Sequence, residues 1–203
     1  MIVERETNKV YLQGVVNSKP ELNHKVKDEE FFGFDMKIDR LSGQSDLIPV
    51  IISKQLLDFY NVKEGDSLGV RGQFRSYNKL DGEKRKLILS VFAKEICQSE
   101  EDVLSNMIEL EGYICKPVIY RTTPFSREIC DILLAVNRNF NKSDYIPCIA
   151  WGANAQMASM LNVPTKVHLI GRIQSREYTK KIKDSDLVTK TAYEVSISKL
   201  YNL

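Results

Sequence analysis

"NKVYLQGVV", residues 8–16, returns as "NMIELEGYI" at residues 106–114, 98 positions further along the chain. Both stretches place Asn first, Val or Ile third, Leu fifth, Gly seventh and Val or Ile ninth. Two further matches keep the same spacing: Asp39-Arg40 with Asn137-Arg138, and SDLIPV from Ser45 with SDYIPC from Ser143. Several matches at one ungapped spacing indicate an internal repeat, which has to be recognised before a fold is assigned.

The repeat predicts two copies of one domain within the 203 residues. The N-terminal copy covers residues 1–97 and the C-terminal copy residues 106–203, and domains of about 100 residues are of ordinary size. The joint, QSEEDVLSN at residues 98–106, is short and acidic and contains no Gly or Pro run. We therefore expect the two copies to lie close together.

Each copy reads as a series of strands with one short helix. The opening KVYLQGVV alternates polar and apolar residues, as a half-buried strand does, and Gly14 and Gly112 indicate a bulge or bend in the first strands. The other strands are FFGFDMKID, LIPVII, DSLGVRGQFRSY and KLILSVFAKEI, matched by REICDILLAVN, YIPCIAW, TKVHLIGRIQSREY and KTAYEVSISKL. KQLLDFY and ANAQMASML form helices after the third strands. The predicted fold is all-β: two tandem OB-folds, which are five-stranded Greek-key barrels, each with a short helix after strand 3.

Composition excludes several classes of protein. No stretch is apolar for long enough to cross a bilayer, and MIVERETNKV lacks the apolar region of a secretion signal, so we expect a cytoplasmic protein without membrane contact. The cysteines, Cys97, Cys115, Cys130 and Cys148, form no C-x-x-C pair, and only His24 and His168 add possible metal ligands. We expect reduced thiols, no metal and no cofactor. The chain has no G-x-x-x-x-G-K loop and no His-Cys or His-Asp set, so we expect no enzyme.

Charge is divided unevenly between the copies. Residues 1–105 carry 16 basic and 18 acidic side chains, whereas residues 106–203 carry 13 basic and 9 acidic side chains. The C-terminal copy is therefore the better candidate for binding a polyanion.

Aromatic residues of the C-terminal copy occur where an OB barrel binds its ligand, on strands 2 and 3 and the loops around them. Phe140 follows strand 2, Tyr145 opens strand 3, and Trp151 closes it. Tyr145 and Trp151 are an even number of residues apart and so share a face, while Tyr178 ends strand 4. The basic residues among these rings are Arg138, Lys142, Arg172, Arg176, Lys180 and Lys181. Such a groove binds single-stranded nucleic acid, because rings stack on bases and cations follow the phosphates.

Each ring also has a purely structural interpretation. Trp151 is placed to plug the end of the barrel, and Tyr145 to pack against the other copy. Tyr178 fits an ordinary solvated hairpin, whereas the polar surroundings of Phe140, NRNFNKSD, argue against a core position.

At this point the C-terminal copy resembles the bacterial and phage single-stranded DNA-binding (SSB) protein family. The resemblance rests on LLAVNRNFNKSDYIPCIAWGANAQ, VHLIGRIQSREY and YEVSISKL, and it spans roughly residues 105–200. It implies an OB-fold and sequence-independent binding of single-stranded DNA in replication, recombination or repair. The stacking aromatics of the family fall on Phe140, Tyr145, Trp151 and Tyr178.

The chain departs from the family pattern in three respects. It ends VSISKLYNL, without the acidic, apolar tip that recruits repair proteins, so that recruitment is not expected. NVPTK replaces the usual Lys-Gly before strand 4, and two copies are present. Because the family commonly presents four OB domains together, two per chain predict a homodimer by analogy.

The N-terminal copy keeps the strand pattern but loses most of the rings. Ser42, Leu47 and Ser53 occupy the positions of Phe140, Tyr145 and Trp151, and Tyr77 is the remaining counterpart of Tyr178. We interpret this copy as a structural or weakly binding domain and keep Tyr77 as a candidate site residue.

Two rival functions remain open from the sequence. One is an OB-fold adaptor of a replication or conjugation assembly, because an aromatic face also binds protein. The other is RNA binding, because no feature of the sequence reads the 2′-hydroxyl.

Overall fold

The computed structural model describes residues 6–82, 84–99, 103–139, 141–182 and 186–203. The first half contains β1 (Asn8–Val16), β2 (Glu21–Val26), β3 (Glu29–Asp39), β4 (Ser45–Ser53), α1 (Lys54–Tyr60), β5 (Ser67–Asp81) and β6 (Lys84–Cys97). The second half contains β7 (Asn106–Ile114), β8 (Ile119–Thr122), β9 (Glu128–Arg138), β10 (Lys142–Trp151), α2 (Ala153–Ser159), β11 (Thr165–Ile182) and β12 (Asp186–Asn202). The prediction of an all-β chain with a helix after the third main strand of each half is confirmed.

The sequence analysis missed one strand in each half. Strands β2 and β8 pair with the outer edges of β3 and β9, so the described residues of each half form six strands rather than the predicted five. All residues of both strands are exposed. A strand with no buried face has no alternation of polar and apolar residues, and periodicity therefore could not reveal it.

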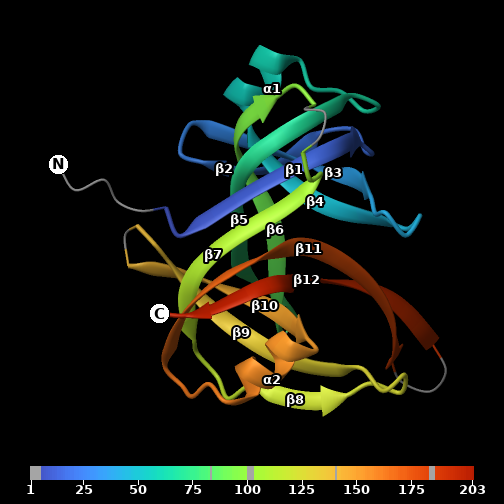
Figure 1. Ribbon diagram of the computed structural model, residues 1–203. Coiled ribbons are helices and arrows are strands. Elements are labelled where there is room, and N and C mark those ends of the chain that lie inside the picture. Colours follow the sequence, from blue (N-terminus) through green and yellow to red (C-terminus); the bar gives the residue numbers. More distant parts are fainter. Residues whose placement is uncertain (1–5, 83, 100–102, 140, 183–185) are drawn as a thin grey trace.

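All the strands belong to one sheet, whose order reflects the repeat. The order β2-β3-β4-β6-β5-β1 continues as β7-β11-β12-β10-β9-β8, and the additional pairings β3–β1 and β7–β9 close each half. Figure 1 shows β1 and β7 crossing the middle of the molecule side by side, with the rest of each half on either side.

Glycine permits the closure of each half. A Cβ added at Gly14 would lie 2.2 Å from the carbonyl oxygen of Lys37 on β3, and one at Gly112 would lie 2.5 Å from that of Ala135 on β9. These glycines stand where the first strand of each half reaches the strand that closes it. The expected bend is therefore a close approach of two backbones that no side chain would allow.

The two halves are related by an approximate twofold axis through the β1–β7 ladder. Val10 pairs with Ile108 at the centre, and both are buried. Asn8 pairs with Leu110 while Leu12 pairs with Asn106, so partners exchange under the 98-residue shift. The repeat thus folds as a dimer within one chain, with an isologous interface.

Buried carboxylates from each half bind the backbone of the other. Asp46 on β4 accepts hydrogen bonds from the Ser175 backbone N at 2.7 Å and the Ser175 Oγ at 3.2 Å. Asp144 on β10 accepts from the Ser76 backbone N at 2.6 Å, and the Tyr145 backbone N donates to Ser76 Oγ at 2.7 Å. These reciprocal bonds fix β4 against β11 and β10 against β5.

No helix in the described residues is long and apolar enough to cross a membrane. None of the cysteines in the described residues forms a disulfide, and burial raises the pKa of Cys115, Cys130 and Cys148.

Candidate nucleic-acid interface

The outer face of strands β9–β12, which we name the β9–β12 face, carries the predicted rings Tyr145, Trp151 and Tyr178. Strand β10 pairs with β9 in unbroken register over its whole length, so its side chains alternate strictly. Ile146, Cys148 and Ala150 point into the core, and Tyr145 and Trp151 therefore share the opposite face. Tyr145 is 44% exposed, and its backbone N donates to Ser76 Oγ of the first half at 2.7 Å.

Trp151 lies on this face beside β12 and outside the buried core. Its side chain is half-buried, and its indole Nε1 donates to Ser196 Oγ at 3.1 Å. This bond fixes the edge of the ring to β12 and leaves part of the ring accessible. The position differs from that of a plug inside the barrel.

Strand β11 adds a row of polar and aromatic side chains to the same sheet. Arg172, Arg176 and Tyr178 are spaced by even numbers along a strand that pairs regularly with β12 beyond a bulge at Ile170/Gly171. Arg176 and Tyr178 are exposed. Burial and the nearby charge of Arg40 lower the pKa of Arg172, which donates to Gln174 at 3.1 Å and lies 3.5 Å from Asp46.

The remaining predicted residues are placed less completely. Phe140 and the side chains of Lys180 and Lys181 lie outside the described part of the chain, although the backbone of both lysines belongs to β11. Lys142 is exposed at the start of β10. Arg138 ends β9 with its Nε 3.2 Å from Asp144 Oδ2.

Tyr77 corresponds structurally to Arg176 rather than to Tyr178. The bulges at Arg71/Gly72 in β5 and Ile170/Gly171 in β11 are equivalent and set an offset of 99 residues on these strands. Tyr77 is 49% exposed and lies on the same face of its strand as Arg75. The tyrosines of the two halves are therefore similar in setting but two residues apart in register.

The first half retains aromatic surface that alignment of the repeats missed. Phe92 on β6 takes the place of Ser196, because Ile51 pairs with Phe92 as Ile149 pairs with Ser196. The Arg75 guanidinium lies 3.9 Å from the Phe92 ring centroid, and the Phe31 ring lies 5.6 Å from Phe92. The ring lost at Ser53 is thus replaced from the neighbouring strand.

A hollow of about 770 Å³ lies between the two halves, and we name it the interdomain hollow. Its basic lining residues come from both halves: Arg75 and Lys94 from the first, and Arg138 and Lys142 from the second. The sequence analysis identified the last two and missed the first two. Gln73, Arg75 and Tyr77 are spaced by two residues and so share one face of β5, which could have indicated that Arg75 lies on the same face as Tyr77. No pattern in the sequence indicated Lys94.

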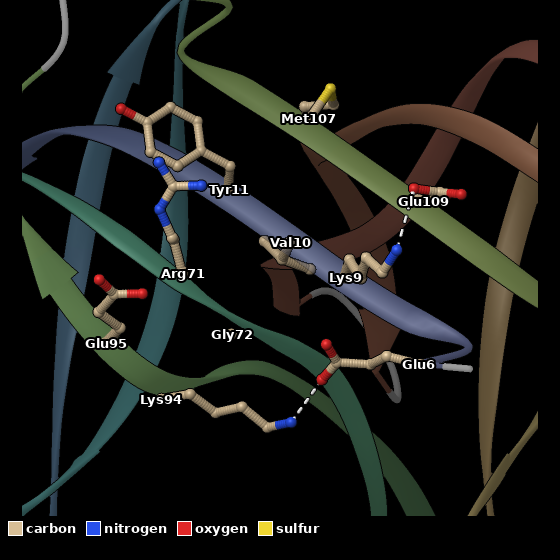
Figure 2. Close-up of a pocket in the computed structure, with 10 residues that line it drawn as sticks. All are labelled: Glu6, Lys9, Val10, Tyr11, Arg71, Gly72, Lys94, Glu95, Met107 and Glu109. Atoms are coloured by element: carbon tan, nitrogen blue, oxygen red, sulfur yellow. Dashed lines mark hydrogen bonds and ion pairs between the residues drawn. The ribbon is translucent and has the colours of Figure 1, made fainter. Parts of the chain in front are cut away.

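A smaller hollow of about 320 Å³ lies beside the β1–β7 ladder. Figure 2 shows two ion pairs in it, one between Lys9 and Glu109 and one between Lys94 and Glu6. Its three basic side chains, Lys9, Arg71 and Lys94, are matched in number by Glu6, Glu95 and Glu109. The Arg71 guanidinium lies 5.0 Å from the Tyr11 ring centroid. This balanced surface is less suited to a polyanion than the interdomain hollow.

Comparison with known proteins adds independent information about the second half. The model of the single-strand binding protein family matches residues 105–203. Single-stranded DNA-binding protein 3 of Streptococcus agalactiae serotype V is 32% identical over 96 residues, which are 44% of this chain and 70% of that protein. Single-stranded DNA-binding protein 1 of Streptococcus agalactiae serotype III is 30% identical over 96 residues, 44% of this chain and 59% of that protein.

A solved structure resembles almost the whole chain. The wild-type single-stranded DNA binding protein from Thermus aquaticus superposes with a TM-score of 0.73 at 21% identity, covering 97% of this chain and 92% of that one. The likeness extends over both halves and confirms the predicted fold of two tandem OB barrels.

Proposed function

The chain belongs to the single-strand binding protein family, and from this premise we propose that it binds single-stranded DNA without regard to sequence and without catalysis. The carrying observation is that Tyr145, Trp151 and Tyr178 project from one sheet whose strands also carry Arg172 and Arg176. Rings of this kind stack on any base, and the cations follow the phosphates. Replication, recombination and repair all expose such strands.

The mode of binding follows from the setting of each side chain. Tyr145 and Tyr178 are exposed enough to meet a base, and Trp151 is held at its edge by Ser196. A ring whose orientation is fixed before binding loses less conformational entropy when a base stacks on it. We propose Phe140, Arg138, Lys142, Lys180 and Lys181 as further contacts, with Arg138 also paired with Asp144.

The division into domains at residues 1–97 and 106–203 is part of this proposal. It is supported by the sheet order, in which β1–β6 and β7–β12 form separate runs. A homodimer would then present four OB domains. We also propose a cytoplasmic location, since cysteines that form no disulfide are usual in a reducing compartment.

Titration of the protein with an unstructured oligonucleotide, followed by Trp151 fluorescence, tests the proposal. The chain has one Trp, so quenching reports this face alone. The affinity should fall with salt by about 0.7 in log–log slope for each phosphate neutralised on a single strand. An adaptor that binds protein would show no quenching and no such slope, and competition with an RNA of the same sequence distinguishes the two polymers.

A further inference from the structure

The interdomain hollow has an excess of positive charge among its lining residues. Arg75, Lys94, Arg138 and Lys142 face it, and Glu6 is the acidic residue among those that line it. The neutral polar residues of the lining are Thr7, Asn8, Gln73, Asn137 and Asn139. Cations and amide donors converging on one space form a site for an anion rather than for an apolar ligand.

The Glu6 carboxylate already lies in this hollow as an anion. Its Oε1 accepts from Lys94 Nζ at 2.5 Å and from Gln73 Nε2 at 3.1 Å. The hydrogen bond from Lys94 holds the pKa of Glu6 below its usual range, so the side chain is charged at neutral pH. Lys94 and Gln73 could donate the same hydrogen bonds to a phosphate oxygen.

The two arginines of the hollow differ in their partners: Arg138 forms an ion pair with Asp144, whereas Arg75 donates to the neutral Gln73 Oε1. Burial, followed by the charge of Arg138, lowers the pKa of Arg75. Arg138 Nε lies 3.2 Å from Asp144 Oδ2, but the angle makes no hydrogen bond, and within the described residues neither buried atom has another partner. A second anion in the hollow would offset the repulsion between the positive charges of Arg75 and Arg138.

The equivalent arginine on the other side of the molecule provides an internal comparison. Arg40 donates to both carboxylate oxygens of Asp46 and to the carbonyl oxygen of Ser175 at 3.2 Å. It corresponds to Arg138 under the 98-residue shift, as Asp46 corresponds to Asp144. The Arg40–Asp46 pair is thus fully hydrogen-bonded. In the equivalent Arg138–Asp144 pair, which borders the interdomain hollow, Arg138 Nε still has a hydrogen bond to donate.

We propose that the interdomain hollow binds the phosphate backbone of a single strand that passes from the β9–β12 face to the first half, and that the Glu6 carboxylate occupies the phosphate position in the free protein. This inference rests on the proposed function. Arg75 lines the hollow and stacks on Phe92, and exposed Tyr77 lies on the same face of β5, so the strand continues from the hollow along this face. Neither Arg75, Lys94 nor Glu6 belongs to the repeat-derived site.

Strand length makes the proposal testable in the full chain. An OB-fold covers about 4–16 nucleotides, so oligo-dT of about 8 nucleotides occupies the β9–β12 face, and one of about 30 nucleotides reaches both halves. The double variant Arg75→Gln/Lys94→Gln should reduce the salt slope of the long strand by roughly 1.4, the value for two phosphate contacts. Binding of the short strand should not change.

Glu6→Gln gives a result of the opposite sign. Removing the competing carboxylate should strengthen binding of the long strand severalfold and leave the short strand unaffected. Lys54→Gln is the matched control, because Lys54 is about as exposed as Lys94, is also paired with an acidic residue, and lies on α1. It should bind both strands as the wild type does.

The results separate this inference from the proposed function. If the short strand quenches Trp151 while the long strand is insensitive to Arg75→Gln/Lys94→Gln, the hollow is not on the path and the inference is wrong, although the function stands. If Glu6→Gln weakens the long strand, the carboxylate does not replace a phosphate. Lys94→Gln and Glu6→Gln change half-exposed side chains and keep the test valid should Arg75→Gln melt early.

Discussion

At the scale of single residues, Trp151 either stacks on a base or packs the end of the barrel, and these two interpretations predict different effects of one substitution. Its half-buried ring and its bond to Ser196 suit a base-stacking platform. Trp151→Ala should weaken oligonucleotide binding by about 1–3 kcal/mol with a nearly unchanged melting temperature. Anisotropy of a labelled strand and thermal melts measure the two quantities.

Two control variants refine the Trp151 test. Trp151→Phe should lose much less affinity, because another ring can still stack. Ser196→Ala removes the orienting bond alone and should cost about 1 kcal/mol or less. A collapsed melting temperature in Trp151→Ala, or unchanged affinity in a folded variant, would show that the ring serves packing.

The equivalent residues Asp46 and Asp144 should respond to pH in opposite directions. Burial would raise the pKa of Asp46, but hydrogen bonds from Arg40 and Ser175 outweigh it and lower the pKa. Burial raises the pKa of Asp144, and Ser76 and Arg138 do not compensate. Asp46→Asn should lower the free energy of unfolding at pH 7 by about 3–5 kcal/mol, the cost of breaking a buried ion pair. Asp144→Asn should lower it by less.

The sign of each pH effect follows from linkage. Ionised Asp46 stabilises the fold above its unfolded pKa of about 3.9, so the deficit of Asp46→Asn should shrink as pH falls below that value. The raised pKa of Asp144 means that its ionised form destabilises the fold. As pH falls from 7 towards about 3.9, Asp144 takes up a proton in the folded state before it does so in the unfolded state. The stability of the wild type relative to Asp144→Asn should therefore increase over this range. Urea unfolding at pH 7, 4.5 and 3 measures both trends, and parallel trends for the two variants would contradict this assignment.

At the scale of elements, the strands that face a core were readable from sequence, and those that do not were not. The apolar segment LIPVII predicts a strand, and its Ile48, Val50 and Ile52 are fully buried on β4. The exposed strands β2 and β8 depend on pairing alone. Phe92 shows a related limit. Its role as a substitute for the lost ring at Ser53 depends on which residues lie side by side on adjacent strands, and the repeat alignment follows one strand at a time.

The glycines of the first strands allow a test of barrel closure. Gly112→Ala would put a Cβ 2.5 Å from the Ala135 carbonyl oxygen, and such overpacking costs roughly 1–3 kcal/mol. Gly33→Ala is the control, since its nearest neighbours are side-chain atoms at 3.3 Å that can move. Equal unfolding free energies for the two variants would mean that the closing pair β7–β9 is loose.

At the scale of the whole molecule, the repeat predicted two similar halves but not the space between them. The interdomain hollow is lined by residues from five separate segments, near positions 6, 73, 94, 137 and 142, and no spacing rule links them. Their proximity depends on the β1–β7 ladder and on the reciprocal bonds of Asp46 and Asp144. Sequence could therefore supply the binding face of one half, but the path between the halves required the assembled structure.

The same assembly bears on association between chains. Two OB barrels within one chain form an internal dimer through β1 and β7, and pairing two chains would present four. Sedimentation at micromolar concentration should give a homodimer, and a strict monomer would contradict this prediction.

The two halves should contribute unequally to binding, and their tyrosines offer a matched comparison. Tyr77 and Tyr178 are 49% and 39% exposed and lie on equivalent strands. Tyr178 shares the β9–β12 face with Tyr145 and Trp151. The surface near Tyr77 has fewer rings, and Phe92 there is covered by Arg75. Tyr178→Ala should therefore weaken binding of a strand of about 30 nucleotides by about 1–3 kcal/mol, and Tyr77→Ala by clearly less. Because both side chains are exposed, neither variant should change the melting temperature, so anisotropy titrations compare them directly. Equal losses would mean that the first half binds the strand as strongly as the second and that its acidic balance does not weaken it.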